Sequence, residues 1–124
     1  MGTREYDLED RLVAYAADVI ALTASLPLSR AGNHIAAQLL RSGTDPAPNY
    51  GEAEAAESKK DFIHKMGICL KELRESRIWL RIIARRRLLG EAELASILSE
   101  TEELIRIFKA SIVTAKRNGS SDAH

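Results

Sequence analysis

The chain has 124 residues, of which 45% are hydrophobic, 29% charged and 5% aromatic, and its formal net charge is zero. This length fits one domain, residues 1–124, with one core, and the abundance of Ala, Leu, Glu and Arg favours helix. No apolar run reaches the roughly 18 residues that a membrane span needs, and the acidic start does not resemble a signal peptide. Cys69 is the single cysteine, so no intramolecular disulfide can form. We expect a cytoplasmic all-α protein without a membrane partner.

The first amphipathic segment runs from Leu8 to Leu26, where apolar residues alternate at spacings of four and three. This spacing puts them on one face of a helix that packs against other helices. Asp7 is the predicted N-cap, and Pro27 ends the helix.

The second segment is predicted to be a helix with a kink near Gly43–Pro46. It begins near Ser29 and buries Ile35 and Leu39, and Gly43 is expected to break or bend it. Two prolines follow, but Pro46 fits the first position of a restarted helix, where its missing N–H costs nothing, with Asp45 as N-cap. The stretch from 49 to 56 completes this arm.

A third helix is expected from Ser58, which with Asp61 forms a start resembling a capping box. Its inward positions, again spaced by four and three, run from Phe62 to Ile83, and Gly90 is the expected stop. A fourth helix follows from about Glu91, with one seam from Leu94 to Ala115. The core of the domain is placed at about residues 7–116, and residues 117–124 are predicted to be a disordered tail.

Four such segments with short connections predict an antiparallel up-and-down four-helix bundle. The third and fourth helices carry apolar residues beyond one seam, which indicates either a broad core or a subunit interface. We favour homo-oligomerisation, with candidate interface residues Ile78, Trp79, Ile82, Leu98, Ile105 and Ile112.

Charge is unevenly distributed despite the zero total. Between Ser58 and Arg87 there are ten Lys and Arg but three acids, while residues 45–57 and 91–103 contain acids and no Lys or Arg. Such segregation can serve neighbouring helices, neighbouring subunits or a bound polyanion. The neutral total favours the first two. The polyanion alternative is RNA or DNA binding on the third helix, with phosphate contacts from Lys59, Lys60, Lys65, Arg85, Arg86 and Arg87.

Three stretches in order, "QLLRSG" (38–43), "NYGEAEAAESKKDF" (49–62) and "KELRESRIWL" (71–80), resemble the bacterial 23S rRNA intervening-sequence proteins. The resemblance spans roughly residues 7–116. It implies an antiparallel four-helix bundle that assembles into ring-shaped homopentamers, and kinship with the accessory protein of diversity-generating retroelements, which engages a reverse transcriptase and nucleic acid. Nucleic acid or a nucleic-acid-processing protein is therefore a further candidate partner. This sequence departs from the family pattern at Asp45, Pro46 and Pro48. Its neutral net charge also differs from that of the retroelement accessory proteins, which are basic.

Polar residues shared with that pattern are interpreted as a structural network between helices or subunits. Glu72, Glu75 and Trp79 fall on one side of the third helix, and buried charges are tolerated when they are paired. An acid/base pair is disfavoured, because no nucleophile or substrate-fixing loop stands beside the carboxylates. The predicted network consists of Arg41, Asn49, Glu52, Asp61, Glu72 and Glu75.

No motif for catalysis or for a cofactor stands out. A di-iron bundle site needs two Glu-x-x-His pairs, whereas Asp61 and His64 form the one pair with that spacing and it uses Asp. Cys69 lies on the apolar seam, which is typical of a small core residue. There is no phosphate loop, nucleophile elbow or zinc spacing. The sequence therefore predicts a non-enzymatic protein without catalytic, cofactor or metal sites.

Overall fold

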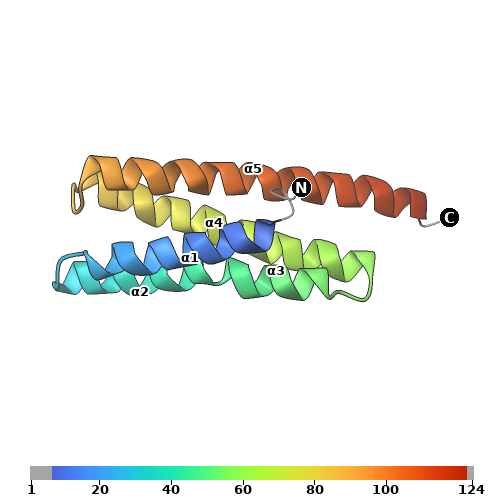
Figure 1. Cartoon of the computed structure of the whole chain (residues 1–124), viewed down its shortest axis with the longest axis horizontal. Helices are drawn as coiled ribbons and strands as arrows, with labels where there is room; N and C mark the ends of the chain where they lie inside the picture. The colour runs from blue at the N-terminus through green and yellow to red at the C-terminus, as the bar shows by residue number, and fades with distance from the viewer. Residues whose placement is uncertain (1–6, 123–124) are drawn as a thin grey trace.

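The computed structural model describes residues 7–122, with side chains described as far as residue 118. It contains α1 (Leu8–Ala24), α2 (Arg30–Thr44), α3 (Pro46–Glu54), α4 (Lys59–Arg85) and α5 (Glu91–Asp122). Figure 1 shows α2 and α3 following each other as one arm, so that four helical rods alternate in direction along the long axis. The predicted all-α four-helix bundle is confirmed. None of the described helices has the length and apolar composition that a bilayer crossing requires.

Neighbours in the bundle follow chain order, and this decides which faces point outward. α1 packs against α2, the α2–α3 arm packs against α4, and α4 packs against α5. The backbone of α1 also comes close to that of α5, whereas the backbones of α1 and α4 do not approach each other within the described residues. α1 and α4 are therefore diagonal partners, and their outward faces lie on opposite sides of the bundle.

The core is formed by the seams that alternate at four and three residues. Every predicted seam position on α1 is buried, and so are Ile35, Leu39 and Ser42 on α2. Burying such side chains stabilises the fold by about 1.5–3 kcal/mol each. The largest fully buried residues are Tyr15, Phe108, Leu12, Leu39, Met66, Leu73, Leu80, Ile83 and Leu104.

Two pairs of hydroxyl groups cross this core. Tyr15 Oη and Thr101 Oγ1 lie 2.7 Å apart, joining α1 to α5, and Ser42 Oγ and Ser76 Oγ lie 2.8 Å apart, joining α2 to α4. Burial raises the pKa of Tyr15, against the opposing effects of its hydrogen bonds, so its hydroxyl stays protonated at neutral pH. Each buried hydroxyl thus has a partner, as burial requires.

Serine side chains begin two of the helices. Ser29 Oγ accepts a hydrogen bond from the Gly32 N–H at 3.0 Å, and Ser58 Oγ accepts one from the Asp61 N–H at 3.0 Å. These bonds satisfy donors that the first turn leaves without a partner. Asp7 holds the predicted N-cap position of α1, but its side chain makes no capping hydrogen bond.

The bend between α2 and α3 lies at Asp45 and Pro46, and Gly43 belongs to α2. Asp45 holds the predicted N-cap position, with Pro46 in the first turn of α3, but it keeps helical angles (φ −63°, ψ −33°) and makes no side-chain capping bond. Its N–H donates to Arg41 O and its carbonyl accepts from the Asn49 N–H, while Pro46 and Pro48 have no N–H to donate. Gly43 is needed for another reason. A Cβ there would come within 2.7 Å of Val19 Cγ2, so glycine lets α2 approach α1 closely.

α4 ends differently from the prediction. Arg87, with φ 54°, adopts the left-handed conformation that glycine usually supplies, and Gly90 has no positive φ. The Arg87 N–H bonds to Ala84 O at 3.1 Å and the Leu88 N–H bonds to Ile83 O at 3.0 Å, which is the Schellman pattern. The stop therefore comes three residues before the expected glycine.

α5 is longer than predicted. It continues through Asp122, so residues 117–122 are helical where a disordered tail was expected. Residues 123–124 of the predicted tail lie outside the described part of the chain.

Candidate interaction surfaces

Arg41 of α2 joins two carboxylates of α4. Its Nη1 donates to Glu72 Oε1 at 2.9 Å and its Nη2 donates to Glu75 Oε2. Trp79 Nε1 donates to the same Glu75 oxygen at 3.1 Å. Glu72 is the most enclosed member, with its side chain 15% exposed. Both carboxylates are used in holding α2 against α4, which is the structural role predicted for these residues.

The other predicted members lie elsewhere. Asn49 Nδ2 donates to Asp45 O at 2.9 Å and so supports the bend. Glu52 accepts from Lys65 Nζ at 2.7 Å, joining α3 to α4. Asp61 lies in the first turn of α4 behind the Ser58 cap. The structure therefore replaces the single predicted network with an Arg41 cluster and separate local contacts, because Asn49 and Glu52 lie on α3 and Asp61 lies in the first turn of α4.

The six candidate interface residues divide into three kinds. Ile105 is 4% exposed and belongs to the core, so it cannot contact another subunit. Leu98, Ile112 and Trp79 are partly buried against that core, and the Trp79 ring meets the His34 ring edge-on at 5.7 Å. Ile78 and Ile82 are exposed, at 47% and 37%.

The outward face of α4 is a line of cations. We define the α4 stripe as the exposed positions spaced by four and three residues on this face, opposite the core seam. His64 and Gly67 occupy the two remaining positions of this row, between Lys60 and Lys71, and no position of the row is an acid. Ile82 lies beside the row. No ion pair within the described residues involves its Lys or Arg side chains. The α4 stripe consists of Lys60, Lys71, Arg74, Ile78, Arg81 and Arg85.

This stripe changes the predicted set of phosphate contacts. Lys65 is paired with Glu52 of α3 and is not one of the stripe positions, and Lys59 lines a hollow at the end of α5. Lys60 and Arg85 belong to the stripe, and Arg86 and Arg87 follow it. Lys71, Arg74 and Arg81 were missed, although the same three-and-four spacing that identified the core seam, followed on the opposite side of the helix, would have found them.

The outward face of α1 was missed entirely. We define the α1 face as Asp10, Val13, Ala17, Ile20 and Ala24, which are exposed, spaced by three and four residues, and flanked by Glu9 and Asp18. Val13 and Ile20 are each 53% exposed. The nearest cation in the sequence, Arg11, is held by Glu100 of α5 at 2.8 Å. This face is therefore apolar and acidic.

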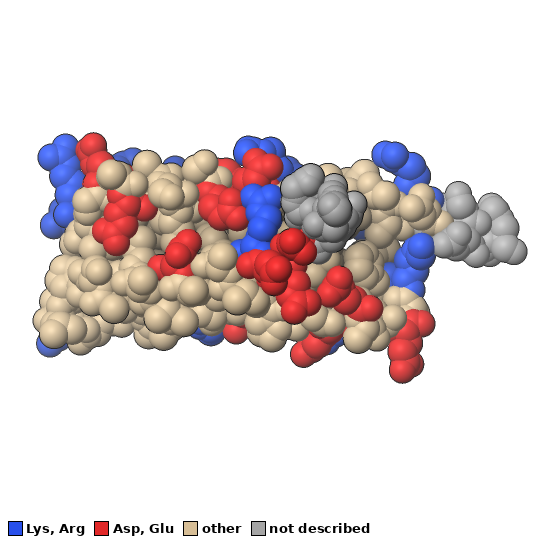
Figure 2. Space-filling view, in the orientation of Figure 1, with Lys and Arg blue, Asp and Glu red and all other residues tan. Residues whose placement is uncertain are grey.

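The surface around α1 extends this pattern. Between Leu12 and Leu40 the chain has two charged side chains, Asp18 and Arg30. Figure 2 shows the result as a broad uncharged area over α1 and α2, with acidic side chains beside it and most basic ones at the margins of the view. Exposed Leu28 and Leu40, at 94% and 40%, lie in the same part of the chain. The surface over α1 and α2 is therefore poor in charge and carries several exposed apolar side chains.

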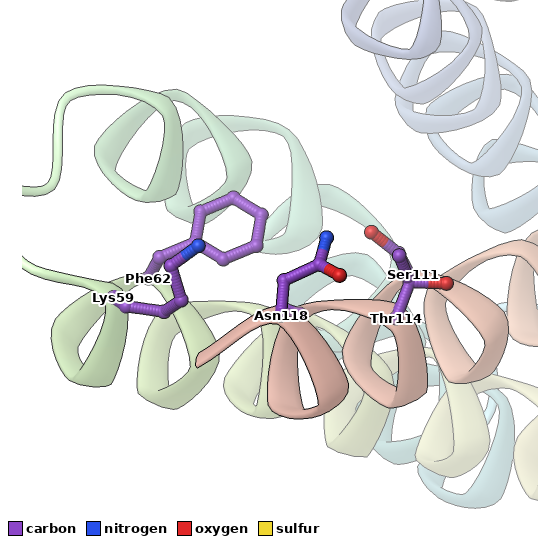
Figure 3. A pocket seen from close by; sticks show the side chains of 6 residues that line it. Lys59, Phe62, Ser111, Thr114 and Asn118 are labelled. Carbon is purple, nitrogen blue, oxygen red and sulfur yellow. The ribbon is translucent and has the colours of Figure 1, made fainter. Parts of the chain in front are cut away.

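The hollows offer little for chemistry. Figure 3 shows the one between the start of α4 and the end of α5, where the hydroxyls of Ser111 and Thr114 lie near Lys59, Phe62 and Asn118. No histidine or carboxylate is among its described lining residues, so no base is placed to activate a hydroxyl. The described residues also contain no cluster of three or more His, Cys, Asp or Glu suited to a metal ion.

Cys69 is enclosed by the core. Its Sγ lies 3.5 Å from Pro46 O, and burial raises its pKa to about 12. A thiol with this pKa is protonated at neutral pH, whereas the thiolate is the reactive form. Cys69 is therefore placed as a packing residue between α4 and α3.

The sequence itself decides the family. The family model described as "23S rRNA-intervening sequence protein" matches residues 4–110. The chain belongs to this family. A crystal structure of a protein from Bacteroides thetaiotaomicron, of unknown function and from the S23 ribosomal protein family, is similar with 31% identity and a TM-score of 0.79. The match covers 84% of this chain and 96% of that one. No curated protein matches the chain.

Membership in the 23S rRNA-intervening sequence protein family confirms the predicted resemblance. It brings no established activity, since the similar Bacteroides thetaiotaomicron protein is itself of unknown function. Functional inference therefore has to start from the surfaces of the bundle, namely the α1 face and the α4 stripe.

Proposed function

We propose that this chain is a non-enzymatic helical-bundle module that assembles with copies of itself and serves as a scaffold for a partner. The observation that carries the proposal is the exposed apolar surface of α1, with Val13 and Ile20 each 53% exposed. Isolated exposed apolar residues are ordinary, but a regular row on one helix is typical of an interface. We further propose that the assembly is a ring of five subunits, and this number rests on the family resemblance alone.

Light scattering on the purified chain tests this function. We expect a mass near five times that of the 13.7 kDa chain, unchanged on dilution through the micromolar range. A mass near that of one chain at all concentrations would remove the proposal. An assembly of another size would retain self-association and exclude the pentamer.

A second candidate function is RNA or DNA binding through the α4 stripe. It is favoured by the row of Lys and Arg side chains that have no ion-pair partner among the described residues, since such cations release counterions when they neutralise phosphates. Filter binding of structured RNA at several salt concentrations tests it, with affinity expected to fall steeply as salt rises. Lys71→Glu with Arg74→Glu and Arg81→Glu should abolish retention. Lys109→Glu with Lys116→Glu and Arg117→Glu, three charge reversals at exposed positions of α5, is the matched control and should have a weaker effect.

A further inference from the structure

The α1 face and the α4 stripe have the same residue spacing and opposite charge. Each is a row of outward positions with three-and-four spacing. Val13 and Ile20 are exposed aliphatic side chains in the α1 face, and exposed Ile78 lies in the α4 stripe with exposed Ile82 beside it. The charges around the first pair are acidic, and those around the second are basic. Spacing of this kind is what allows two helices to pack side by side.

Two hollows near these surfaces combine aliphatic and charged side chains. Ile78 and Ile82 lie in a hollow whose other lining residues are Arg81, Arg85 and Arg86. Beside the α1 face, a hollow between α1 and α5 is lined by Leu22 and Ile97 together with three carboxylates, Asp18, Glu93 and Glu100, the last of which is paired with Arg11. An aliphatic floor with an arginine rim fits an apolar side chain next to an acid. An aliphatic floor with an acidic rim fits an apolar side chain next to a Lys or Arg.

Neither surface suits contact with its own copy. Two α1 faces would bring acids against acids, and two α4 stripes would bring arginines against arginines, and like charges brought together are repelled. Nucleic acid would use the cations of the stripe but leave the two isoleucines without an apolar partner. A surface that is both apolar and acidic satisfies both features, and this chain carries one on its opposite side.

We infer that the α4 stripe of one copy packs on the α1 face of the next copy, so that the chain assembles head to tail. This deepens the proposed function, on whose self-association it rests, by naming the two surfaces. Because α1 and α4 are diagonal in the bundle, every copy presents one surface to each of two neighbours. Repeated contacts of this heterologous kind generate a closed ring when the rotation between copies closes, and a filament when it does not.

Two blocked variants test the pairing. Ile78→Glu with Ile82→Glu blocks the stripe, and Val13→Glu with Ile20→Glu blocks the α1 face. All four positions are at least 37% exposed, so the fold should tolerate the change. Each variant alone should have the mass of a single chain by light scattering. Mixed in equal amounts, they should form a one-to-one complex and nothing larger, because only one intact surface of each kind remains.

Val113→Glu is the matched control, since Val113 is 53% exposed on α5 and belongs to neither surface. It should keep the wild-type mass. Circular dichroism and urea unfolding check that each variant is folded. If the isoleucine variant is unfolded, Arg81→Glu with Arg85→Glu, at fully polar surface positions, should give the same loss of mass and decides the question.

The outcomes separate this inference from the proposed function. A monomeric wild-type chain would contradict both the proposed self-association and the pairing of the two surfaces. Wild-type assembly that persists in either blocked variant overturns the pairing and leaves self-association intact, as does an equimolar mixture that stays monomeric. Loss of RNA retention in the isoleucine variant with no change in mass would assign the stripe to nucleic acid and also overturn the pairing.

Discussion

The two hairpins of this bundle reach stability by different means. In the α1–α2 hairpin, two charged residues lie between Leu12 and Leu40, the helices approach closely at Gly43, and no ion pair among the described residues joins them. The α4–α5 hairpin is longer and highly charged, and Arg77 of α4 contacts Glu102 of α5 at 3.1 Å. The comparison teaches that two helices can be held together by apolar packing, including the close approach of Gly43 to Val19, without charged side chains at their edges.

The largest effect is expected in the core of the charged hairpin. Phe108 is fully buried, and its ring meets the Tyr50 ring edge-on at 5.9 Å. Phe108→Ala should lower the free energy of unfolding by about 3–5 kcal/mol, because it removes a large apolar side chain and leaves a cavity. Urea denaturation measures this. Val113→Ala, on the exposed side of the same helix, should change it by less than about 0.5 kcal/mol.

The close approach in the α1–α2 hairpin should be nearly as sensitive. Gly43→Ala should lower the free energy of unfolding by about 1–3 kcal/mol, because the new methyl group overlaps the Val19 side chain. Gly51→Ala in α3 is the control, since nothing lies within 4 Å of a Cβ there. It should stabilise the protein by up to about 1 kcal/mol through helix propensity. Equal effects of the two substitutions would show that Gly43 is not a packing requirement.

Where the charged hairpin turns, a stabilising change is expected. Arg87→Gly should raise the free energy of unfolding by about 1 kcal/mol, because a residue with a Cβ is strained at φ 54°. Arg86→Gly, one residue earlier at φ −88°, offers no such relief and should not stabilise. Thermal or urea unfolding of both variants makes the comparison. A gain in Arg86→Gly equal to that in Arg87→Gly would contradict the assignment of strain.

The smallest effect is expected for the ion pairs between the hairpins. A double-mutant cycle of Arg41→Ala and Glu72→Ala should give a coupling energy of at most about 1 kcal/mol, since Arg41 is 44% exposed. The coupling should shrink when the salt concentration rises. A coupling well above this, insensitive to salt, would mean that the Arg41 cluster is more enclosed than the chain alone suggests.

The inner architecture could be read from the sequence because the seams alternate regularly. Ile105 shows where that reading stops. Its seven-residue spacing from Leu98 and Ile112 identifies a second row, but spacing alone does not say whether a row faces another helix of the same chain or a second subunit. The structure places Ile105 in the core.

Other features depended on contacts that spacing does not encode. Gly43 looks like a helix breaker until Val19 is seen opposite it. Arg87 takes a left-handed position that propensity assigns to the glycine three residues later. The α1 face was not predicted because its alanines indicate helix formation but do not indicate whether a position is exposed. Lys71, Arg74 and Arg81 were recognised as charged, and the three-and-four spacing would have placed them on one side of α4.

The buried hydroxyl pairs have a consequence for how the helices are aligned along their axes. Seams that repeat nearly every seven residues would pack almost as well after one helix slid by seven positions. Such a slide of α5 would bring Phe108 or Leu94 to the place of Thr101 and remove the hydrogen bond between Thr101 and the Tyr15 hydroxyl, at a cost of about 1–3 kcal/mol. Sliding α4 would likewise remove Ser76 from Ser42. These four polar side chains select one axial register from several that the apolar residues alone would allow.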